Sequence, residues 1–167
     1  MKRDLKSLFD LSGKEIKDII ERAINLKKLR GKVNLQHLSQ KKIALLFEKP
    51  STRTRISFEV GIYELGGIPL YIDAATTQIS RGEPIKDVAR VLSRYVDGIV
   101  FRTFGQERLE ELCKYSSVPI INALSDLFHP CQILADLMTI REHFGSMENK
   151  VVCYICLLYT SPSPRDS

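Results

Sequence analysis

The sequence alternates four short apolar runs with longer segments of helical periodicity, and this alternation limits the folds that are open to it. The apolar runs lie at residues 42–47, 68–72, 98–101 and 118–121. Apolar residues in the segments between them recur every three or four positions, the spacing of amphipathic helices. Strands that alternate with helices pair in parallel through right-handed crossovers. We therefore predict an α/β fold in which a parallel four-stranded sheet is flanked by helices.

Helix signals divide the rest of the chain. A first helix over about 13–29 begins after Ser12 and ends at Gly31. The longest loop, residues 73–84, is polar and long for a compact domain, which favours a functional role. The helices after it are expected to bury the following apolar residues: Val88, Val91, Leu92 and Tyr95; then Leu109, Leu112 and Cys113; then Ile133, Leu137, Ile140 and Phe144.

The turn after the first predicted strand is rich in groups that bind anions. It reads Ser51-Thr52-Arg53-Thr54-Arg55 and leads directly into a helix. The first N–H groups of a helix lack partners and carry partial positive charge, and arginine adds a fork of donors. An ordinary N-cap would explain the hydroxyls alone. The two arginines beside them favour a site for an oxyanion.

Other polar residues follow the later strands and should reach the same edge of the sheet, because ligands of parallel sheets bind beyond the carboxyl ends of the strands. Arg102 ends the third strand, and Asn122 ends the fourth. Pro130 suits the first position of the last helix, which places His129 at its N-cap and Gln132 in its first turn. A histidine that merely caps the helix is the ordinary alternative. We predict that these residues converge on one rim.

These separated motifs resemble the aspartate/ornithine carbamoyltransferase family, and most closely the ornithine carbamoyltransferases. The resemblance covers about residues 1–155 and rests on FEKPSTRTRISFE at 47–59, QISRGE at 78–83, DVARVLSRYVDGIVFR at 87–102, VPIINALSD at 118–126 and HPCQILADLMTI at 129–140. The QISRGE loop and the HPCQILADL segment favour ornithine enzymes over their aspartate relatives. The choice of amine is made elsewhere in the chain, so aspartate and putrescine stay open as alternatives.

The resemblance implies a reaction and roles for individual residues. The family transfers a carbamoyl group from carbamoyl phosphate to the δ-amine of ornithine, giving citrulline and phosphate, without a metal or other cofactor. By this resemblance, Ser51, Thr52, Arg53 and Thr54 would hold the phosphate. Arg102 would bridge the phosphate and the carbonyl oxygen, His129 would donate to that oxygen, and Gln132 would contact the carbamoyl amide. Gln78 would reach the carbamoyl phosphate of a neighbouring subunit in a homotrimer.

The resemblance also divides the chain. Residues 1–145 would form the carbamoyl phosphate-binding domain, with a linker helix at about 130–144. Residues 146–155 would hold the first strand of a truncated amino-acid-binding domain. Residues 156–167 depart from the family, and we expect this tail to be non-native. The ornithine-binding motifs are absent from the sequence, so the chain alone is expected to be inactive.

Charge and cysteine content bear on alternative functions. Residues 1–55 carry fifteen Lys/Arg against six Asp/Glu, whereas residues 56–167 carry ten against fourteen. A basic segment can bind nucleic acid, but an aromatic stacking series is lacking, so we expect no nucleic-acid partner. A non-catalytic phosphate-binding or assembly module is the other alternative. The four cysteines are too few and too scattered for a secreted disulfide scaffold, and the CxxC at 153–156 stands alone, so we expect a cytoplasmic protein. No apolar stretch is long enough to span a membrane, so we expect no membrane partner.

Overall fold

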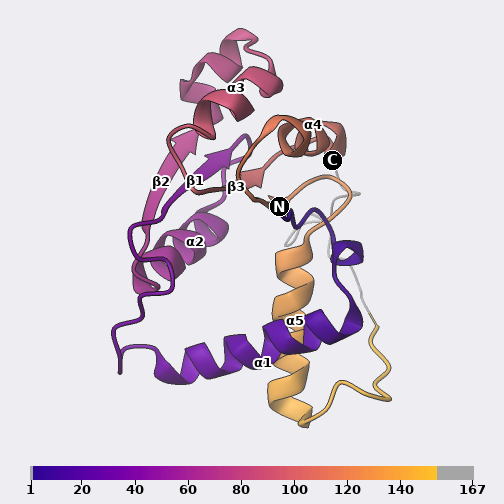
Figure 1. Ribbon diagram of the computed structural model, residues 1–167. Coiled ribbons are helices and arrows are strands. Elements are labelled where there is room, and N and C mark those ends of the chain that lie inside the picture. Colours follow the sequence, from indigo (N-terminus) through magenta and orange to yellow (C-terminus); the bar gives the residue numbers. More distant parts are fainter. Residues whose placement is uncertain (1, 154–167) are drawn as a thin grey trace.

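The computed structural model describes residues 2–153 (Figure 1). Its helices and strands are α1 (Gly13–Leu29), β1 (Lys42–Phe47), α2 (Thr52–Glu64), β2 (Ile68–Asp73), α3 (Ile85–Leu92), β3 (Gly98–Arg102), α4 (Gln106–Tyr115), β4 (Ile120–Leu124) and α5 (Pro130–Phe144), with short 3-10 turns η1 (Leu8–Asp10), η2 (Ala74–Thr76) and η3 (Gln78–Arg81). The helix predicted over 13–29 is confirmed, and so is the strand predicted over 42–47. The polar loop after β2 contains the turns η2 and η3.

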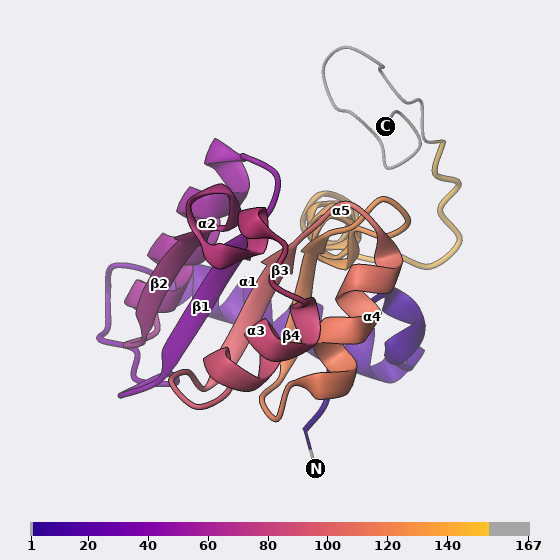
Figure 2. The same cartoon turned by 90° about the horizontal axis from the view of Figure 1, so that it is seen from above.

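The four strands form one parallel sheet in the order β2-β1-β3-β4, which confirms the predicted fold class. Most residues of the two central strands are buried, four of six in β1 and four of five in β3, as expected for a parallel sheet covered on both faces. Helices α3 and α4 cover one face, while α2 covers the other together with α1 and α5 (Figures 1 and 2). Because all strands run the same way, their carboxyl ends lie along one rim of the sheet.

The fourth strand begins later than its apolar run. Strand β4 covers Ile120–Leu124, whereas the apolar residues begin at Val118. Ser116 holds the preceding backbone in a turn, since its Oγ accepts from Val118 N at 3.1 Å and donates to Val118 O at 2.9 Å. Pro119 has no N–H for a strand ladder. Pairing with β3 therefore starts at Ile120 and continues through Leu124.

Helix α3 buries only part of the predicted stripe: Val88 is buried and Leu92 packs against the core, as predicted. Ile85, Val88 and Ala89 are buried, whereas Val91 is 52% exposed and Tyr95 is 71% exposed. The helix ends at Leu92, so Tyr95 lies beyond it. The buried stripe begins one turn earlier, at Ile85, because Pro84 occupies the N-cap and the helix starts directly after it. The predicted burial of Val91 and Tyr95 is wrong.

Helix α5 leaves much of its predicted apolar stripe exposed. Ile133 is 46% exposed and Phe144 is 64% exposed. Near its C-terminus the helix crosses α1, to which two ion pairs join it: Arg141 Nε–Glu21 Oε1 at 2.7 Å and Lys27 Nζ–Glu142 Oε2 at 2.9 Å. The i, i+4 pattern correctly predicts the helix. It does not by itself provide a surface for that stripe to pack on.

The N-terminal residues add a contact that periodicity did not predict. Leu5 forms a parallel bridge with Ile121 at the outer edge of β4. Its N–H donates to Ile120 O at 2.9 Å, and its carbonyl accepts from Asn122 N at 2.9 Å. Asp4 Oδ1 accepts from Ile120 N at 2.9 Å. The start of the chain thereby covers the outer edge of β4.

The end of the described segment differs from the strand that was expected within residues 146–155. Residues 150–153 have no strand pairing, and residues 151–153 are exposed. Isolated strands are not stable without a neighbour to pair with, and residues 2–153 offer none here. Positions 154 and 155, and the tail at 156–167, lie outside the described residues. Within the described part, no helix is long and apolar enough to cross a membrane.

Candidate anion-binding site

The turn after β1 caps α2 and presents its N-terminus at the rim. Ser51 is the N-cap, and its Oγ accepts from Thr54 N at 3.4 Å while donating to Thr54 Oγ1 at 3.0 Å. Thr52 and Arg53 are exposed in the first turn. No acidic residue lies in that turn, so the partial positive charge of the helix end is not neutralised locally. The arrangement suits an anion.

The two arginines of this turn have different surroundings. Arg55 lies over the ring of Tyr71, with 3.6 Å from its guanidinium carbon to the ring centroid. It also pairs with Glu59, Nε to Oε1 at 3.0 Å. These contacts hold Arg55 against β2 and its own helix. Both side chains are exposed, but only Arg55 has an ion-pair partner among the described residues.

Arg102 ends β3 at the same rim and carries an unpaired donor. Its carbonyl accepts from Glu48 N at 2.8 Å, which joins the ends of β3 and β1. Its Nε is buried and has no hydrogen-bond partner among the described residues. Burial lowers the pKa of this guanidinium. A buried donor without an acceptor is costly, so this atom marks a position that an anionic or carbonyl oxygen would satisfy.

His129 is the N-cap of α5, as the position of Pro130 predicted. Its Nδ1 accepts from Gln132 N at 3.3 Å, which requires the proton of the neutral ring to be on Nε2. Burial and the nearby positive charge of Arg102 lower the pKa of His129 to about 4, although Asp136 acts in the opposite direction. At neutral pH the ring is therefore uncharged, and its Nε2–H is the group that could donate a hydrogen bond.

Arg102 pairs with Leu124 where β3 and β4 end, five residues before His129, and its positive charge contributes to the lowered pKa of His129. Gln132 follows in the first turn of α5, and its Nε2 donates to Asp136 Oδ1 at 2.9 Å. Contacts between the rim segments also link the Ser51 turn to this region. Lys49 Nζ pairs with Asp126, and it lies 4.5 Å from the centroid of the Phe104 ring.

Gln78 lies apart from this group. It begins η3, after the outer strand β2, and it is exposed. Strands β1 and β3 lie between β2 and β4, so the two outer strands are separated by about 14 Å across the sheet. The structure thus brings Ser51, Arg102 and His129 to one rim and leaves Gln78 at its far end.

Sequence reasoning missed the contacts that hold the rim together. Glu48 accepts hydrogen bonds from Thr103 and Arg108, and Lys49 pairs with Asp126. The partners of Glu48 and Lys49 lie 55 to 77 residues away along the chain. The only local signal is the pair of opposite charges, Glu48 and Lys49, that stands before Pro50 and the Ser51 turn.

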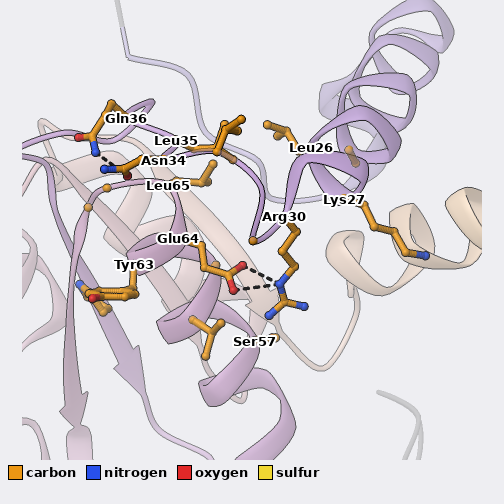
Figure 3. Close-up of a pocket in the computed structure, with 18 of the residues that line it drawn as sticks. Leu26, Lys27, Arg30, Asn34, Leu35, Gln36, Ser57, Tyr63, Glu64 and Leu65 are labelled. Atoms are coloured by element: carbon orange, nitrogen blue, oxygen red, sulfur yellow. Dashed lines mark hydrogen bonds and ion pairs between the residues drawn. The ribbon is translucent and has the colours of Figure 1, made fainter.

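A large groove of the described residues lies elsewhere. It has a volume of about 1160 Å³ and is formed by the end of α1, residues 31–36 and one side of α2. Figure 3 shows Arg30, just beyond α1, reaching Glu64 of α2, with 2.9 Å between Nε and Oε1. None of the rim residues described above lines this groove.

Comparison with known proteins identifies the family. Residues 3–142 match the model of the aspartate/ornithine carbamoyltransferase, carbamoyl-P binding domain. The chain belongs to the aspartate/ornithine carbamoyltransferase family. The resemblance inferred from the STRTR and HPCQ motifs is therefore confirmed, and the rim residues lie within the matched domain.

Relatives and solved structures agree with this placement. The ornithine carbamoyltransferase of Desulfotalea psychrophila is 55% identical over 152 residues, which are 90% of this chain and 50% of that protein. The structure of the Pyrococcus furiosus ornithine carbamoyltransferase has a TM-score of 0.82 at 50% identity, covering 86% of this chain and 46% of that one. The catalytic subunit of M. jannaschii aspartate transcarbamoylase has a TM-score of 0.79 at 37% identity, covering 86% and 48%. The chain spans about half the length of the relatives it matches.

Proposed function

We propose that this chain is the carbamoyl phosphate-binding half of an ornithine carbamoyltransferase. The complete enzyme would transfer the carbamoyl group of carbamoyl phosphate to the δ-amine of ornithine, giving citrulline and phosphate. One observation carries the proposal: the capped N-terminus of α2, the unpaired Nε of Arg102 and the neutral ring of His129 lie on one rim. The names of the relatives point to the same reaction.

The phosphate would lie at the N-terminus of α2. Ser51, Thr52, Arg53 and Thr54 would supply hydroxyl, backbone and guanidinium donors there. Arg102 would bridge the phosphate and the carbonyl oxygen. Gln132 would contact the carbamoyl amide. In this arrangement a dianion is held by fixed donors and by one helix end, and no metal or organic cofactor is required.

Catalysis would follow from charge movement during attack. The neutral amine nitrogen forms a bond to the carbonyl carbon and drives negative charge onto the carbonyl oxygen. The carbonyl then re-forms as the bond from its carbon to the phosphate oxygen breaks, so the phosphate leaves with the electron pair and the nitrogen gives up a proton to the phosphate or to water. His129 Nε2–H and the Arg102 guanidinium would stabilise the charge on the carbonyl oxygen, and the Ser51 turn before α2 would stabilise the charge on the departing phosphate. One such preorganised donor contributes about 3–4 kcal/mol.

The parts of the proposal that concern assembly rest on the family. Residues 1–145 would form the carbamoyl phosphate domain with α5 as its linker, and residues 146–155 would begin the amino-acid-binding domain. Gln78, at the far end of the rim from His129, would serve the site of a neighbouring subunit in a cytoplasmic homotrimer. Its exposed position after β2 supports a role outside its own site.

A second candidate is a phosphate-binding module without catalysis. It is favoured by the fact that the donors on the rim, at the N-terminus of α2 and on Arg102, suit an anion whether or not a reaction follows. Citrulline formation from carbamoyl phosphate and ornithine would decide for the enzyme. Catalysis needs both reactants held together, so saturable binding of carbamoyl phosphate without turnover would favour the module.

Calorimetric titration with carbamoyl phosphate, and separately with inorganic phosphate, tests the site. We expect saturable binding that Arg102→Leu weakens by about a hundredfold, because charge-assisted hydrogen bonds are lost. Arg22→Leu, at an exposed position on α1, is the matched control and should bind like the unmodified chain. Equal affinities for the Arg102 and Arg22 variants would refute the assigned site.

A further inference from the structure

Glu48 lies between β1 and the Ser51 turn, and it is bound to the neighbouring segment through both its backbone and its side chain. Its N–H donates to Arg102 O at 2.8 Å. Its carboxylate accepts a hydrogen bond from Thr103 Oγ1. Both carboxylate oxygens also accept from Arg108 Nε, each at 3.1 Å, and a further bond comes from Arg108 Nη2.

This carboxylate is almost removed from solvent. The side chain of Glu48 is 6% exposed, and Thr103 is fully buried. A buried carboxylate requires compensating donors. The two-pronged contact with Arg108 supplies charge and geometry together, which a point charge such as lysine would not reproduce. These contacts hold the Glu48 carboxylate in place, so it is not free to bind a ligand.

These contacts separate the roles of the two arginines near the rim. Arg108 Nε and Nη2 are engaged by Glu48, whose carboxylate raises the pKa of Arg108. The Nε of Arg102 has no partner among the described residues. Glu48 itself is an acceptor and has no donor in its ionised side chain for an anion. Its place in the site is therefore indirect.

We infer that Glu48 is a positioning residue for the anion site. Held by Arg108 and Thr103, it fixes the end of β1 against the end of β3, which sets the Ser51 turn relative to Arg102. Arg108 also neutralises a carboxylate that would otherwise stand unpaired three residues before the Ser51 turn. The inference deepens the proposed function and rests on it as far as the ligand is concerned.

The closing experiment uses the full chain with inorganic phosphate as the probe. Thr103→Val removes the hydroxyl at nearly constant volume, and Thr103→Ser keeps the hydroxyl as the matched control. Glu48→Gln, Arg108→Gln and the double variant form a thermodynamic cycle. Phosphate affinity is measured by calorimetry at a temperature where circular dichroism shows every variant folded, so that loss of stability alone leaves the affinity unchanged.

We expect Arg108→Gln to weaken phosphate binding by about tenfold, and the double variant to bind no more weakly than Arg108→Gln alone. Thr103→Val should weaken binding, whereas Thr103→Ser should not. Affinities within twofold of the unmodified chain in folded Arg108→Gln and Thr103→Val would overturn the inference. Losses that simply add in the double variant would overturn it as well.

Amide hydrogen exchange gives a readout that needs no ligand. The N–H of Glu48, which is bonded to Arg102 O, should exchange about tenfold faster in Thr103→Val than in Thr103→Ser. Equal exchange in the two variants would overturn the positioning role. If the unmodified chain bound neither phosphate nor carbamoyl phosphate, the proposed function would fail, and the exchange rates would still decide the role of Glu48.

Discussion

Acidification should destabilise this fold through His129. Burial and the charge of Arg102 lower its pKa from 6.5 to about 4 in the folded chain. Because the unfolded chain binds this proton first, stability falls as the pH drops from about 6.5 to about 4, and His129 contributes no further loss below that. The full difference corresponds to about 3 kcal/mol at 1.36 kcal/mol per pKa unit. Solvent reaches part of the ring, which reduces the expected loss to about 1–2 kcal/mol.

Urea unfolding near pH 7 and near pH 4.5 measures this contribution as a difference between variants. Carboxylates also titrate in that interval, so His129→Gln is compared with the unmodified chain. His37→Gln, at an exposed position, is the control. We expect the loss of unfolding free energy on acidification to be smaller in His129→Gln by about 1–2 kcal/mol. An identical loss in all three proteins would refute the reasoning.

Nuclear magnetic resonance tests the same point at the level of the ring. The His129 ring protons should titrate with a midpoint near pH 4, and nitrogen shifts at neutral pH should show the tautomer protonated at Nε2. A midpoint at the ordinary histidine value of about 6.5 would contradict the buried, neutral ring. Protonation at Nδ1 would contradict the capping bond to Gln132.

Two further predictions compare matched residues. Arg53→Ala should weaken phosphate binding by about tenfold. Arg55→Ala should change phosphate binding by less than about twofold, because Arg55 is held by Tyr71 and Glu59. Calorimetry measures both, and equal effects would contradict the different roles given to the two arginines. Ile20→Ala should lower the free energy of unfolding by about 2–5 kcal/mol, because Ile20 is 1% exposed. Ile133→Ala should lower it by less than about 1 kcal/mol, because Ile133 is 46% exposed. Urea unfolding measures both, and similar losses would show that the apolar stripe on α5 is packed.

The fold could be predicted because its signals are local. The apolar run before Pro50 and the capped helix after it determine β1 and α2 within a few residues. Parallel pairing then follows from the order of the elements, and it brings Ser51, Arg102 and His129 to one rim. The convergence was predictable from topology, although no single residue of the three is diagnostic alone.

Two kinds of feature could not be predicted from the sequence. One is a contact between residues far apart along the chain, and the other is the choice between two similar apolar stripes on one helix. Val91 and Tyr95 fit a helical period as well as Ile85 and Ala89 do, and only packing against α4 selects the second set. The environment of Glu48 depends on Arg108, sixty residues later. Periodicity carries no information about such pairs, so the support of the site became visible only in the structure.

The pairing of the first helix with the last has a consequence for the timing of folding. Lys27 meets Glu142 across 115 residues of chain, and Leu5 pairs with β4 over a similar separation. During synthesis, α1 leaves the ribosome first but finds its partner only after α5 has been made. Contacts between such distant residues form slowly, because a long loop must close before they stabilise the fold. A chain released shortly after Leu124 would leave α1 without α5, so the earliest helix is among the last to acquire its native contacts.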